Sequence, residues 1–573
     1  MKLLFVFASP EFLRYYDTTM KTLAARGHHV SVGVNYLRER KHARLDVLLD
    51  DSRIDILGQV PPRADLWGPF ARAVRGSWDF VRYLHPTLAS AAALRQRMKR
   101  KSAPAIVRWL DRYPSLDAGR LERLYRLLRL AESAVPVDTR LVAMLREQRP
   151  DVVIVSPLVD ARSEQVDLIR AAQSIGIPAV LGVASWDNLT NKGHLRVVPD
   201  VVTVWNEQQK TEAVTLHGIP PAHVRVTGAQ LFDRWFERTT SQSRDAFCAM
   251  VGLPPGKRII LYTGSSVFIA RSEFEVPFVR KWIGAVRASE RPELRDAAIL
   301  IRPHPFNCDS WEHAEFPEGE YGTVGVWPRQ RYTPAAESSR DSFYDSLFFS
   351  DAVVGINTSA MIEAAILRKP VLSLLTPEFA GTQEGTLHFR YLLPENGGFL
   401  RVASSLPEHV SQLAEVLQHP DVVQQQLERF VGAFLRPGGL DIPATPAVAD
   451  VFEEAAGLRP GPITEGPGVL IARALLWPVA ALTALLSPPL DVDGKATDSW
   501  TKRLGPASER LVKQLIIKPW RVSNRLAHGA LRRLTKQGRQ AWRVGRAVPG
   551  RLLRAARHAR YHLAVRLRGA GRP

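Results

Sequence analysis

The residues best suited to chemistry lie in two short runs between positions 297 and 375. The first run, AAILIRPHPFN, contains Arg302 and His304. The second run, DAVVGINTSAMIEAAILRKPVLSLL, contains an Asn-Thr-Ser triplet and then Glu363. A cation and an imidazole can neutralise a phosphate, and a carboxylate can accept hydrogen bonds from ribose hydroxyl groups. We therefore interpret the two runs as parts of one site for a nucleotide diphosphate.

Both runs have the pattern of a buried strand that ends in polar residues. In the second run these residues are Asn357, Thr358 and Ser359, and they open a helix expected over 360–368. In an open parallel sheet such residues meet at the carboxyl edge, where ligands bind. The free N–H groups and the positive dipole end of the helix suit a phosphate. Glu363 lies one turn further along the same helix face as Ser359.

Structural roles explain part of this pattern as well. A serine or threonine at a helix start is the usual N-cap, and Glu363 complements the helix dipole. His304 is different, because it stands between two prolines at a strand end, where a rigid loop holds a side chain in place. After the apolar run RIILYT, Gly264, Ser265 and Ser266 offer further backbone N–H groups for the phosphates. The co-location of these groups favours a binding site.

The RPHP run, followed downstream by a strand, NTS and EAAILRKPV, resembles the nucleotide-binding half of GT-B transferases. It is most similar to the branch of capsule-polysaccharide and CDP-glycerol glycerophosphotransferase-like enzymes. The similarity is clear over 257–405, is weaker over 1–236 and ends near 460. It implies two Rossmann-like, doubly wound α/β domains with the active site between them. The glutamate pair typical of retaining enzymes is absent, since its second position is Val371, so the stereochemistry stays open.

The resemblance also implies roles for the residues named above. Arg302, His304 and Ser359 would neutralise the diphosphate as it leaves, with His304 counted as catalytic, and Glu363 would hold the ribose. The whole donor-binding set is Gly264, Ser265, Ser266, Arg302, His304, Asn357, Thr358, Ser359 and Glu363. The nucleotide-activated sugar is a co-substrate, and neither a further cofactor nor a bound metal is expected.

The acceptor is expected to contact strand ends of the first domain. Trp186, Asp187 and Asn188 follow the apolar run PAVLGVAS, and Asp187 is the first candidate for a general base. An Asx-turn explains Asp187 and Asn188 equally well. Asp160 is the second candidate base, and Ser9 and Glu11 are further acceptor-side candidates because they follow the first strand.

The order of strands and helices predicts two domains with additions. Residues 1–236 form an acceptor domain that opens with a βαβ unit, and no glycine-rich dinucleotide fingerprint follows its first strand. Residues 64–149 are a helical insertion, which is either a structural buttress or a cationic face for a phosphorylated lipid acceptor. Residues 245–456 form the donor domain, and 457–468, rich in Gly and Pro, form a linker.

The charge of the chain lies mostly in its last part. The formal net charge is +20, and residues 501–573 hold 20 of the 77 basic residues but only one of the 57 acidic ones. The remainder of the chain is therefore close to neutral. The basic part has no recognisable base-reading module, so a nucleic acid is the less favoured partner. Leucines and arginines at helical spacing in this part fit the surface of an anionic membrane.

An apolar stretch precedes the basic part. Residues 469–490 are long enough to cross a bilayer but contain Arg473, Pro478 and Pro488. A single crossing would separate the basic part from the enzyme, so a helix in the membrane plane or a re-entrant helix is favoured. We interpret 469–573 as a membrane-associating extension of a cytoplasmic protein that is peripheral or monotopic at the inner face of the plasma membrane. Two cysteines without paired spacing and the lack of an export signal agree with this location.

The resulting hypothesis is a glycosyltransferase that moves a sugar from a nucleotide-activated donor to a cell-envelope polysaccharide or a lipid-linked acceptor. Three alternatives remain. The same site could serve a transferase of polyol phosphate from a CDP-alcohol, or an enzyme like the sugar-nucleotide 2-epimerases. A protein that binds nucleotide and membrane without catalysis is the third.

Overall fold

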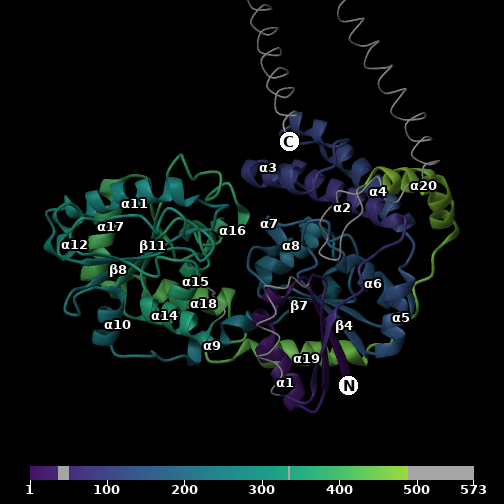
Figure 1. Ribbon diagram of the computed structural model, residues 1–573, viewed down its shortest axis with the longest axis horizontal. Helices are drawn as coiled ribbons and strands as arrows, with labels where there is room; N and C mark the ends of the chain where they lie inside the picture. Colours follow the sequence, from purple (N-terminus) through teal and green to yellow (C-terminus); the bar gives the residue numbers. More distant parts are fainter. Residues whose placement is uncertain (37–50, 333–335, 488–573) are drawn as a thin grey trace, which may run out of the picture. The chain divides into compact units, whose positions relative to one another are not determined.

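The computed structural model describes residues 1–36, 51–332 and 336–487. The described chain contains two parallel sheets, one of seven strands in the order β3-β2-β1-β4-β5-β6-β7 and one of six in the order β10-β9-β8-β11-β12-β13 (Figure 1). The predicted α/β class with two Rossmann-like domains in a GT-B-like arrangement is confirmed.

The strands of the first sheet are β1 (Lys2–Phe7), β2 (His29–Val34), β3 (Ile54–Gln59), β4 (Val152–Ser156), β5 (Ala179–Gly182), β6 (Val201–Val204) and β7 (Val224–Val226). Its helices are α1 (Asp17–Ala25), α5 (Thr139–Gln148), α6 (Gln165–Ser174), α7 (Asn188–Asn191) and α8 (Glu207–His217). The alternation of side chains along β1 builds a core on each face. Leu3, Phe5 and Phe7 pack with α1, and Leu4 and Val6 pack with α5, α6 and α8.

The strands of the second sheet are β8 (Ile259–Thr263), β9 (Ala298–Arg302), β10 (Val324–Val326), β11 (Ala352–Gly355), β12 (Val371–Leu374) and β13 (Arg401–Ala403). Its helices are α10 (Arg244–Val251), α11 (Ser272–Arg287), α12 (Pro292–Arg295), α13 (Glu318–Tyr321), α14 (Glu337–Phe348), α15 (Ala360–Ile366), α16 (Leu387–Arg390), α17 (Leu406–Gln418) and α18 (Gln424–Phe434). Thr263 at the end of β8 is in register with Arg302 of β9 and with Gly355 of β11. Three strand ends therefore carry the predicted donor loops at one edge of this sheet.

Two helices connect the domains. α9 (Asp233–Glu237) leads from the first to the second, and α19 (Ala444–Gly457) returns and packs beside α1 on the first sheet (Figure 1). Phe452 of α19 contacts Phe5 with ring centroids 5.7 Å apart. The end of the range predicted as the second domain, 444–456, thus packs on the first. Asp233 fixes the crossing by accepting hydrogen bonds from Arg436 and Thr445.

The helical insertion is an ordered part of the first domain. It consists of α2 (Trp67–Val81), α3 (Ala92–Lys101), α4 (Ala118–Ala134) and short 3-10 turns. Buried ion pairs join it to α6: Arg75 of α2 pairs with Glu132 at 2.8 Å and with Asp167 of α6 at 2.7 Å. Because these groups are buried, they hold the insertion in one position, as expected for a buttress.

The segment after α19 begins as the predicted linker and ends in a long apolar helix. Residues 458–466 have no regular structure, and Ile463 donates its N–H to the carbonyl of Gln173 at 2.9 Å. α20 (Pro467–Leu486) then packs on α2 and α4. By length and composition it is the one helix among the described residues that could cross a membrane. The basic helices predicted beyond residue 501 lie outside the described residues.

Candidate functional site

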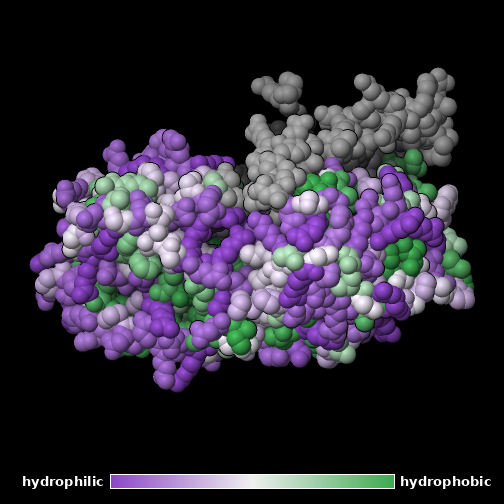
Figure 2. All heavy atoms as spheres, turned by 90° about the horizontal axis from the view of Figure 1, so that it is seen from below, coloured by the Kyte–Doolittle hydropathy of each residue, from purple (hydrophilic) through white to green (hydrophobic). Residues whose placement is uncertain are grey.

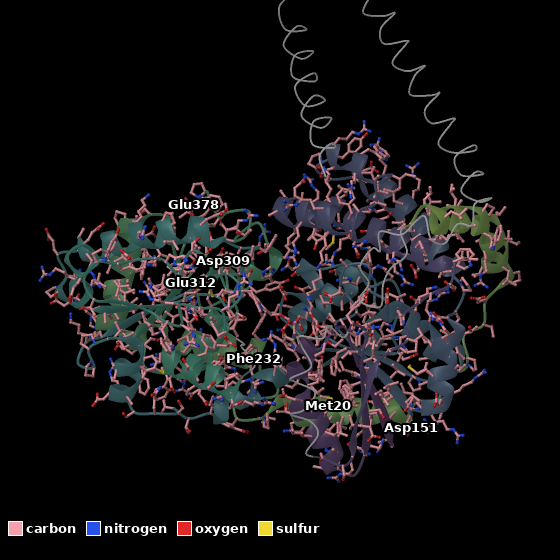
Figure 3. All side chains as sticks on the ribbon, in the orientation of Figure 1. Met20, Asp151, Phe232, Asp309, Glu312 and Glu378 are labelled. Carbon is pink, nitrogen blue, oxygen red and sulfur yellow. The ribbon has the colours of Figure 1, made fainter. Side chains whose placement is uncertain are left out.

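A cavity of about 370 Å³ lies between the two domains, within the size range of small-molecule sites. The first domain and the connecting segment contribute Arg14, Tyr15, Ser185, Trp186, Trp205, Phe232, Arg234, Trp235 and Arg238 to its lining. The second domain contributes Gly264, Arg302, His304, Phe306, Tyr332, Arg340, Phe343, Thr358, Ser359 and Glu363. Phe232, labelled in Figure 3, marks where the domains meet. Among the described residues the cavity wall holds five arginines and one carboxylate, but Arg234, Arg238 and Arg340 form ion pairs with carboxylates outside the wall.

The structure brings together most of the residues predicted to bind the donor. Those that share the cavity are Gly264, Arg302, His304, Thr358, Ser359 and Glu363, and Trp186 from the acceptor side also lines it. Their positions follow from the aligned ends of β8, β9 and β11. Gly264 is fixed by packing, since a Cβ atom there would lie 2.8 Å from the backbone nitrogen of His304. The loop after β8 can therefore pass close beneath the RPHP loop.

Three predicted donor residues do not line this cavity. The backbone N–H of Ser265 donates to Glu275 at 2.8 Å, and Ser265 is fully buried. Ser266 accepts hydrogen bonds from the next turn of its own loop through its carbonyl. Asn357 is buried and donates to the carbonyl of Thr382 at 2.6 Å. These groups shape the loops rather than face the cavity.

His304 is a neutral hydrogen-bond donor toward the cavity. Its Nδ1 accepts the N–H of Phe306 at 3.3 Å, so the proton of the neutral ring lies on Nε2. Burial and, to a smaller extent, the positive charge of Arg14 together lower the pKa of His304 to about 4. At neutral pH the ring therefore offers an N–H group without a formal charge.

Arg302 is a buried cation that faces the cavity. Its side chain is 3% exposed, and its Nη1 donates to the hydroxyl groups of Ser342 at 3.0 Å and Ser346 at 2.9 Å. Within 1–36, 51–332 and 336–487, no carboxylate forms an ion pair with it, and its Nε has no partner. Burial lowers the pKa of Arg302. A buried cation with neutral partners is costly, and a bound anion would offset that cost.

Glu363 lies on α15 and faces the same cavity as His304. Burial raises its pKa to about 7, against the opposing effect of the positive charge of Arg14. Ser359, one turn earlier, is at the N-cap position, but its side chain caps no N–H group of the helix. A capping role would require the hydroxyl group of Ser359 to bond to the helix backbone. Because it does not, this hydroxyl group is available to a ligand.

The loop that contains Asp187 behaves as a structural turn. The carboxylate accepts hydrogen bonds from Ser185 at 2.7 Å and from Asn191 at 2.9 Å. Burial would raise its pKa, but His388, Lys192 and these hydrogen bonds together lower it. An ionised, fully bonded carboxylate with a lowered pKa is a weak base. Asp187 also does not line the cavity, and its carboxylate accepts hydrogen bonds from side chains rather than from the backbone N–H of an Asx-turn.

Apart from Trp186, the other acceptor-side candidates also lie outside the cavity wall. The side chain of Asn188 accepts the N–H of Ala184 at 3.2 Å, and Asp160 pairs with Lys192 at 3.0 Å. Ser9 and Glu11 begin the 3-10 helix η1 (Pro10–Tyr15) without lining the cavity.

Sequence reasoning missed the arginines that line the cavity from outside the donor loops. Arg14 follows the first strand at its carboxyl end, and this position was the available signal. Its Nη2 donates to the hydroxyl of Tyr15 at 2.7 Å. Arg340 lies on α14 and Arg234 on α9, where nothing in the sequence pattern distinguishes them from surface arginines.

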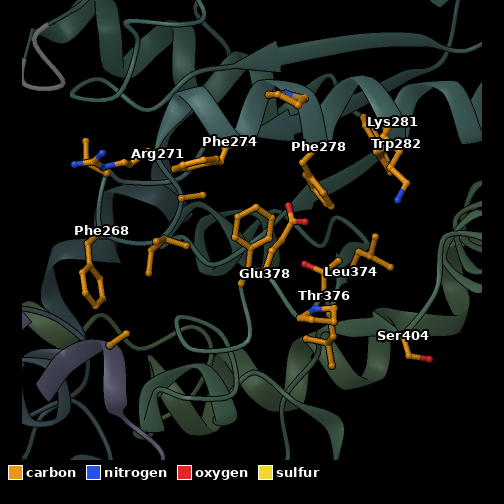
Figure 4. A pocket seen from close by; sticks show the side chains of 18 of the residues that line it. Phe268, Arg271, Phe274, Phe278, Lys281, Trp282, Leu374, Thr376, Glu378 and Ser404 are labelled. Carbon is orange, nitrogen blue, oxygen red and sulfur yellow. The ribbon is translucent and has the colours of Figure 1, made fainter. Parts of the chain in front are cut away.

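A second and larger cavity, of about 1620 Å³, contains none of the predicted site residues. α11 lines it with Phe274 and Phe278, and the loop after β12 lines the opposite side with Thr376 and Glu378 (Figure 4). The described residues contain no group of three His, Cys, Asp or Glu that could hold a metal ion.

No protein-family model matches the sequence, and no curated protein matches it. Among solved structures, the UDP-GlcNAc 2-epimerase from Neisseria meningitidis bound to UDP-GlcNAc is 14% identical with a TM-score of 0.46, covering 79% of this chain and 100% of that one. A glycosyltransferase from Rickettsia africae is 10% identical with a TM-score of 0.44, covering 80% and 98%. The wall teichoic acid polymerase TagF is 9% identical with a TM-score of 0.40, covering 79% and 88%. Similarities this low assign no activity to the chain.

Proposed function

We propose that this protein is a glycosyltransferase that takes a sugar from a nucleotide-activated donor and passes it to a cell-envelope polysaccharide or a lipid-linked acceptor. The observation that supports it is the cavity between the domains, where Arg302 at the end of β9, His304 in the loop after it and Glu363 of α15 meet. Arg14 and Arg302, which lie beside His304 in the wall, suit a ligand with two negative charges.

The roles follow from the chemistry of a departing diphosphate. Negative charge grows on the leaving phosphate oxygen as the bond to the sugar breaks. The Nε2–H of His304 and the guanidinium of Arg302 are fixed donors that stabilise this charge without reorganising. The hydroxyl group of Ser359 adds a third donor. Glu363 accepts hydrogen bonds from the ribose and so orients the donor.

Nucleotide binding can be tested by thermal unfolding. A nucleoside diphosphate of the right base is expected to raise the melting temperature of the wild-type protein, since a ligand at 100 times its Kd stabilises by about 2.7 kcal/mol. The double variant His304→Ala/Glu363→Ala should show no such shift. Differential scanning fluorimetry with all common nucleoside diphosphates measures this, and the lack of any shift would contradict the site.

The products of turnover separate the competing activities. Sugar transfer releases a nucleoside diphosphate, whereas transfer of a polyol phosphate from a CDP-alcohol releases CMP. An epimerase converts a UDP-sugar without an acceptor and leaves the nucleotide attached. Incubation with a panel of nucleotide sugars and CDP-alcohols, followed by chromatography of the nucleotides, distinguishes these results from binding without turnover.

Binding of the donor is expected to depend on pH through Glu363. Its pKa of about 7 means that the carboxylate, which accepts the ribose hydroxyl hydrogen bonds, forms as the pH rises through neutrality. The affinity for a nucleotide sugar should therefore increase from pH 6 to pH 8. In Glu363→Gln it should be independent of pH and about 10-fold weaker at pH 8, the value of one hydrogen bond to a charged group. Isothermal titration calorimetry at several pH values measures both effects.

We place this activity at the inner face of the plasma membrane. The support comes from the apolar helix α20 and from the basic residues that follow it in the sequence. A lipid-linked acceptor would then reach the cavity from the membrane surface. Sedimentation with anionic vesicles, weakened but not abolished by salt, checks this location.

A further inference from the structure

The outer face of α20 is apolar along its whole length. Every exposed residue from Leu470 to Leu486 has an apolar side chain. The large ones are between 45% and 73% exposed and include Leu470, Ile471, Leu475, Trp477, Leu482 and Leu485. A helix that packs on a protein by one face normally presents polar residues on the other. Polar residues cover most of the face seen in Figure 2, so this helix is an exception that implies a partner.

The inner face of α20 is firmly attached to the insertion. Ala480 is buried among Trp67, Phe70 and Val74 of α2, and Leu476 packs on the same cluster. Between these contacts and the start of the helix, Arg473 donates its Nε to the carbonyl of Ala134 at 2.8 Å and pairs with Glu465. Crossing a bilayer would break this packing and carry Arg473 into the hydrocarbon. The attachment therefore favours a helix that lies along the membrane surface.

The helix α4 extends this face. Leu127 is 64% and Leu130 is 47% exposed, although they are large and apolar. Leu127 lies one turn before Ala131, which packs on the cluster that contains Ala480 of α20. Leu130 lies one turn before Ala134, whose carbonyl accepts the hydrogen bond from Arg473 of α20. The docking face, defined as the exposed side of α20 together with Leu127 and Leu130, thus spans two packed helices.

The charges beside the docking face identify the partner as an anionic lipid surface. Arg123, Arg126 and Arg129 are exposed on α4 and flank Leu127 and Leu130 in the sequence, and the one acidic residue among them, Glu122, pairs with Arg126 at 3.9 Å. Apolar residues next to arginines are typical of helices that lie in the headgroup region of anionic membranes. We propose that the docking face inserts in the plane of an anionic lipid bilayer without crossing it, with α4 of the insertion as part of the contact.

The docking face is testable in the full-length protein. Vesicles of phosphatidylcholine and phosphatidylglycerol at about 1 M salt reduce the electrostatic contribution of the basic residues, because the screening length falls to about 3 Å. Under these conditions Leu475→Asp/Leu482→Asp is expected to bind at least about 10-fold more weakly than wild type, because two large apolar side chains no longer enter the bilayer. Leu127→Asp/Leu130→Asp should weaken binding in the same direction. The matched control is Ile442→Asp, at a side chain that is 57% exposed on another surface and should leave binding unchanged.

The depth of Trp477 separates docking from crossing. Trp477 is in the middle of α20, so a crossing helix would place it at the bilayer centre. The fluorescence of Trp477 is obtained as the difference between wild type and Trp477→Phe. We expect lipids brominated near the headgroup to quench this signal most strongly. Strongest quenching by bromine near the chain ends would overturn the in-plane arrangement.

Other occupants of the face give different results. If a second copy covers it, size-exclusion chromatography with light scattering will show a dimer that Leu475→Asp/Leu482→Asp converts to a monomer. If residues 488–573 cover it, that variant will bind vesicles as well as wild type does. Either result would overturn the proposal.

Discussion

Replacing His304 with alanine is expected to lower the kcat of donor cleavage by about 10²- to 10³-fold, the effect of removing one fixed donor to a developing negative charge. The Nε2–H of His304 faces the cavity, and the bond from Phe306 to Nδ1 keeps the ring in that tautomer. The variant should still bind the nucleotide, because Arg302 and Glu363 remain. Release of nucleoside diphosphate under saturating donor measures the effect.

The control for this variant is His313→Ala, since His313 is an exposed histidine of the same domain that does not line the cavity. It should have wild-type kcat. In His304→Gln the side-chain amide supplies an N–H donor, so part of the rate should return. Wild-type activity in His304→Ala would show that the cavity is not the site of donor cleavage.

The pH dependence of His304 separates a neutral donor from an acid. With a pKa of about 4 in the free protein, His304 stays neutral between pH 5 and pH 8. Its titration should therefore be absent from the profile of kcat/KM, which reports the free enzyme. A decline of kcat/KM above pH 6.5 that disappears in His304→Gln would instead identify the imidazolium as the active form.

The sequence pattern was sufficient to predict the elements that carry the donor site. The apolar runs that end at Thr263, Arg302 and Gly355 became neighbouring strands, and the parallel register placed their loops at one edge. The prediction succeeds because the spacing of apolar residues and the positions where strands end are local properties of the chain. The orientation of a backbone N–H is not local. Ser265 could not be excluded from the sequence because its partner, Glu275, lies on another element.

Contacts between distant segments explain the remaining differences. The sequence pattern assigns 444–456 to the second domain, because nothing local in the chain shows that α19 packs on β1 and α1 of the first. Arg14 and Arg340 reach the cavity from opposite domains, and only the fold brings them together. For the same reason the pattern left open whether the insertion is a buttress or a lipid-binding face. In the structure its inner side packs with α6 and its outer side carries the proposed docking face.

Replacing Asp167 with asparagine is expected to destabilise the first domain by about 3–5 kcal/mol, because it leaves a buried charge without its partner. Asp167 is 2% exposed and accepts hydrogen bonds from Arg63 at 2.8 Å and from Arg75 at 2.7 Å. Asparagine keeps the size of the side chain but removes the charge that neutralises both guanidinium groups. Glu132 alone then pairs with Arg75.

The urea midpoint of the first domain and the rate of proteolysis within 64–149 measure this loss. The control is Asp309→Asn, which removes an exposed pair with Arg331 and should cost less than about 1 kcal/mol. Equal effects of the two variants would contradict a role of the buried ion pairs in holding the insertion.

The pH dependence of stability gives a second check on Asp167. Burial would raise its pKa, but Arg75 and Arg63 outweigh that effect and lower the pKa to about 2. Because the pKa is lowered in the folded protein, the stabilisation is fully present above the unfolded pKa of about 4 and is lost as the pH falls toward 2. The difference in unfolding free energy between wild type and Asp167→Asn should therefore be constant from pH 5 to pH 8 and shrink below pH 4. Protonation alone accounts for about 2 kcal/mol of that difference. The larger loss expected at neutral pH reflects the two buried arginines, each of which loses one of its two carboxylate partners and keeps only Asp65 or Glu132.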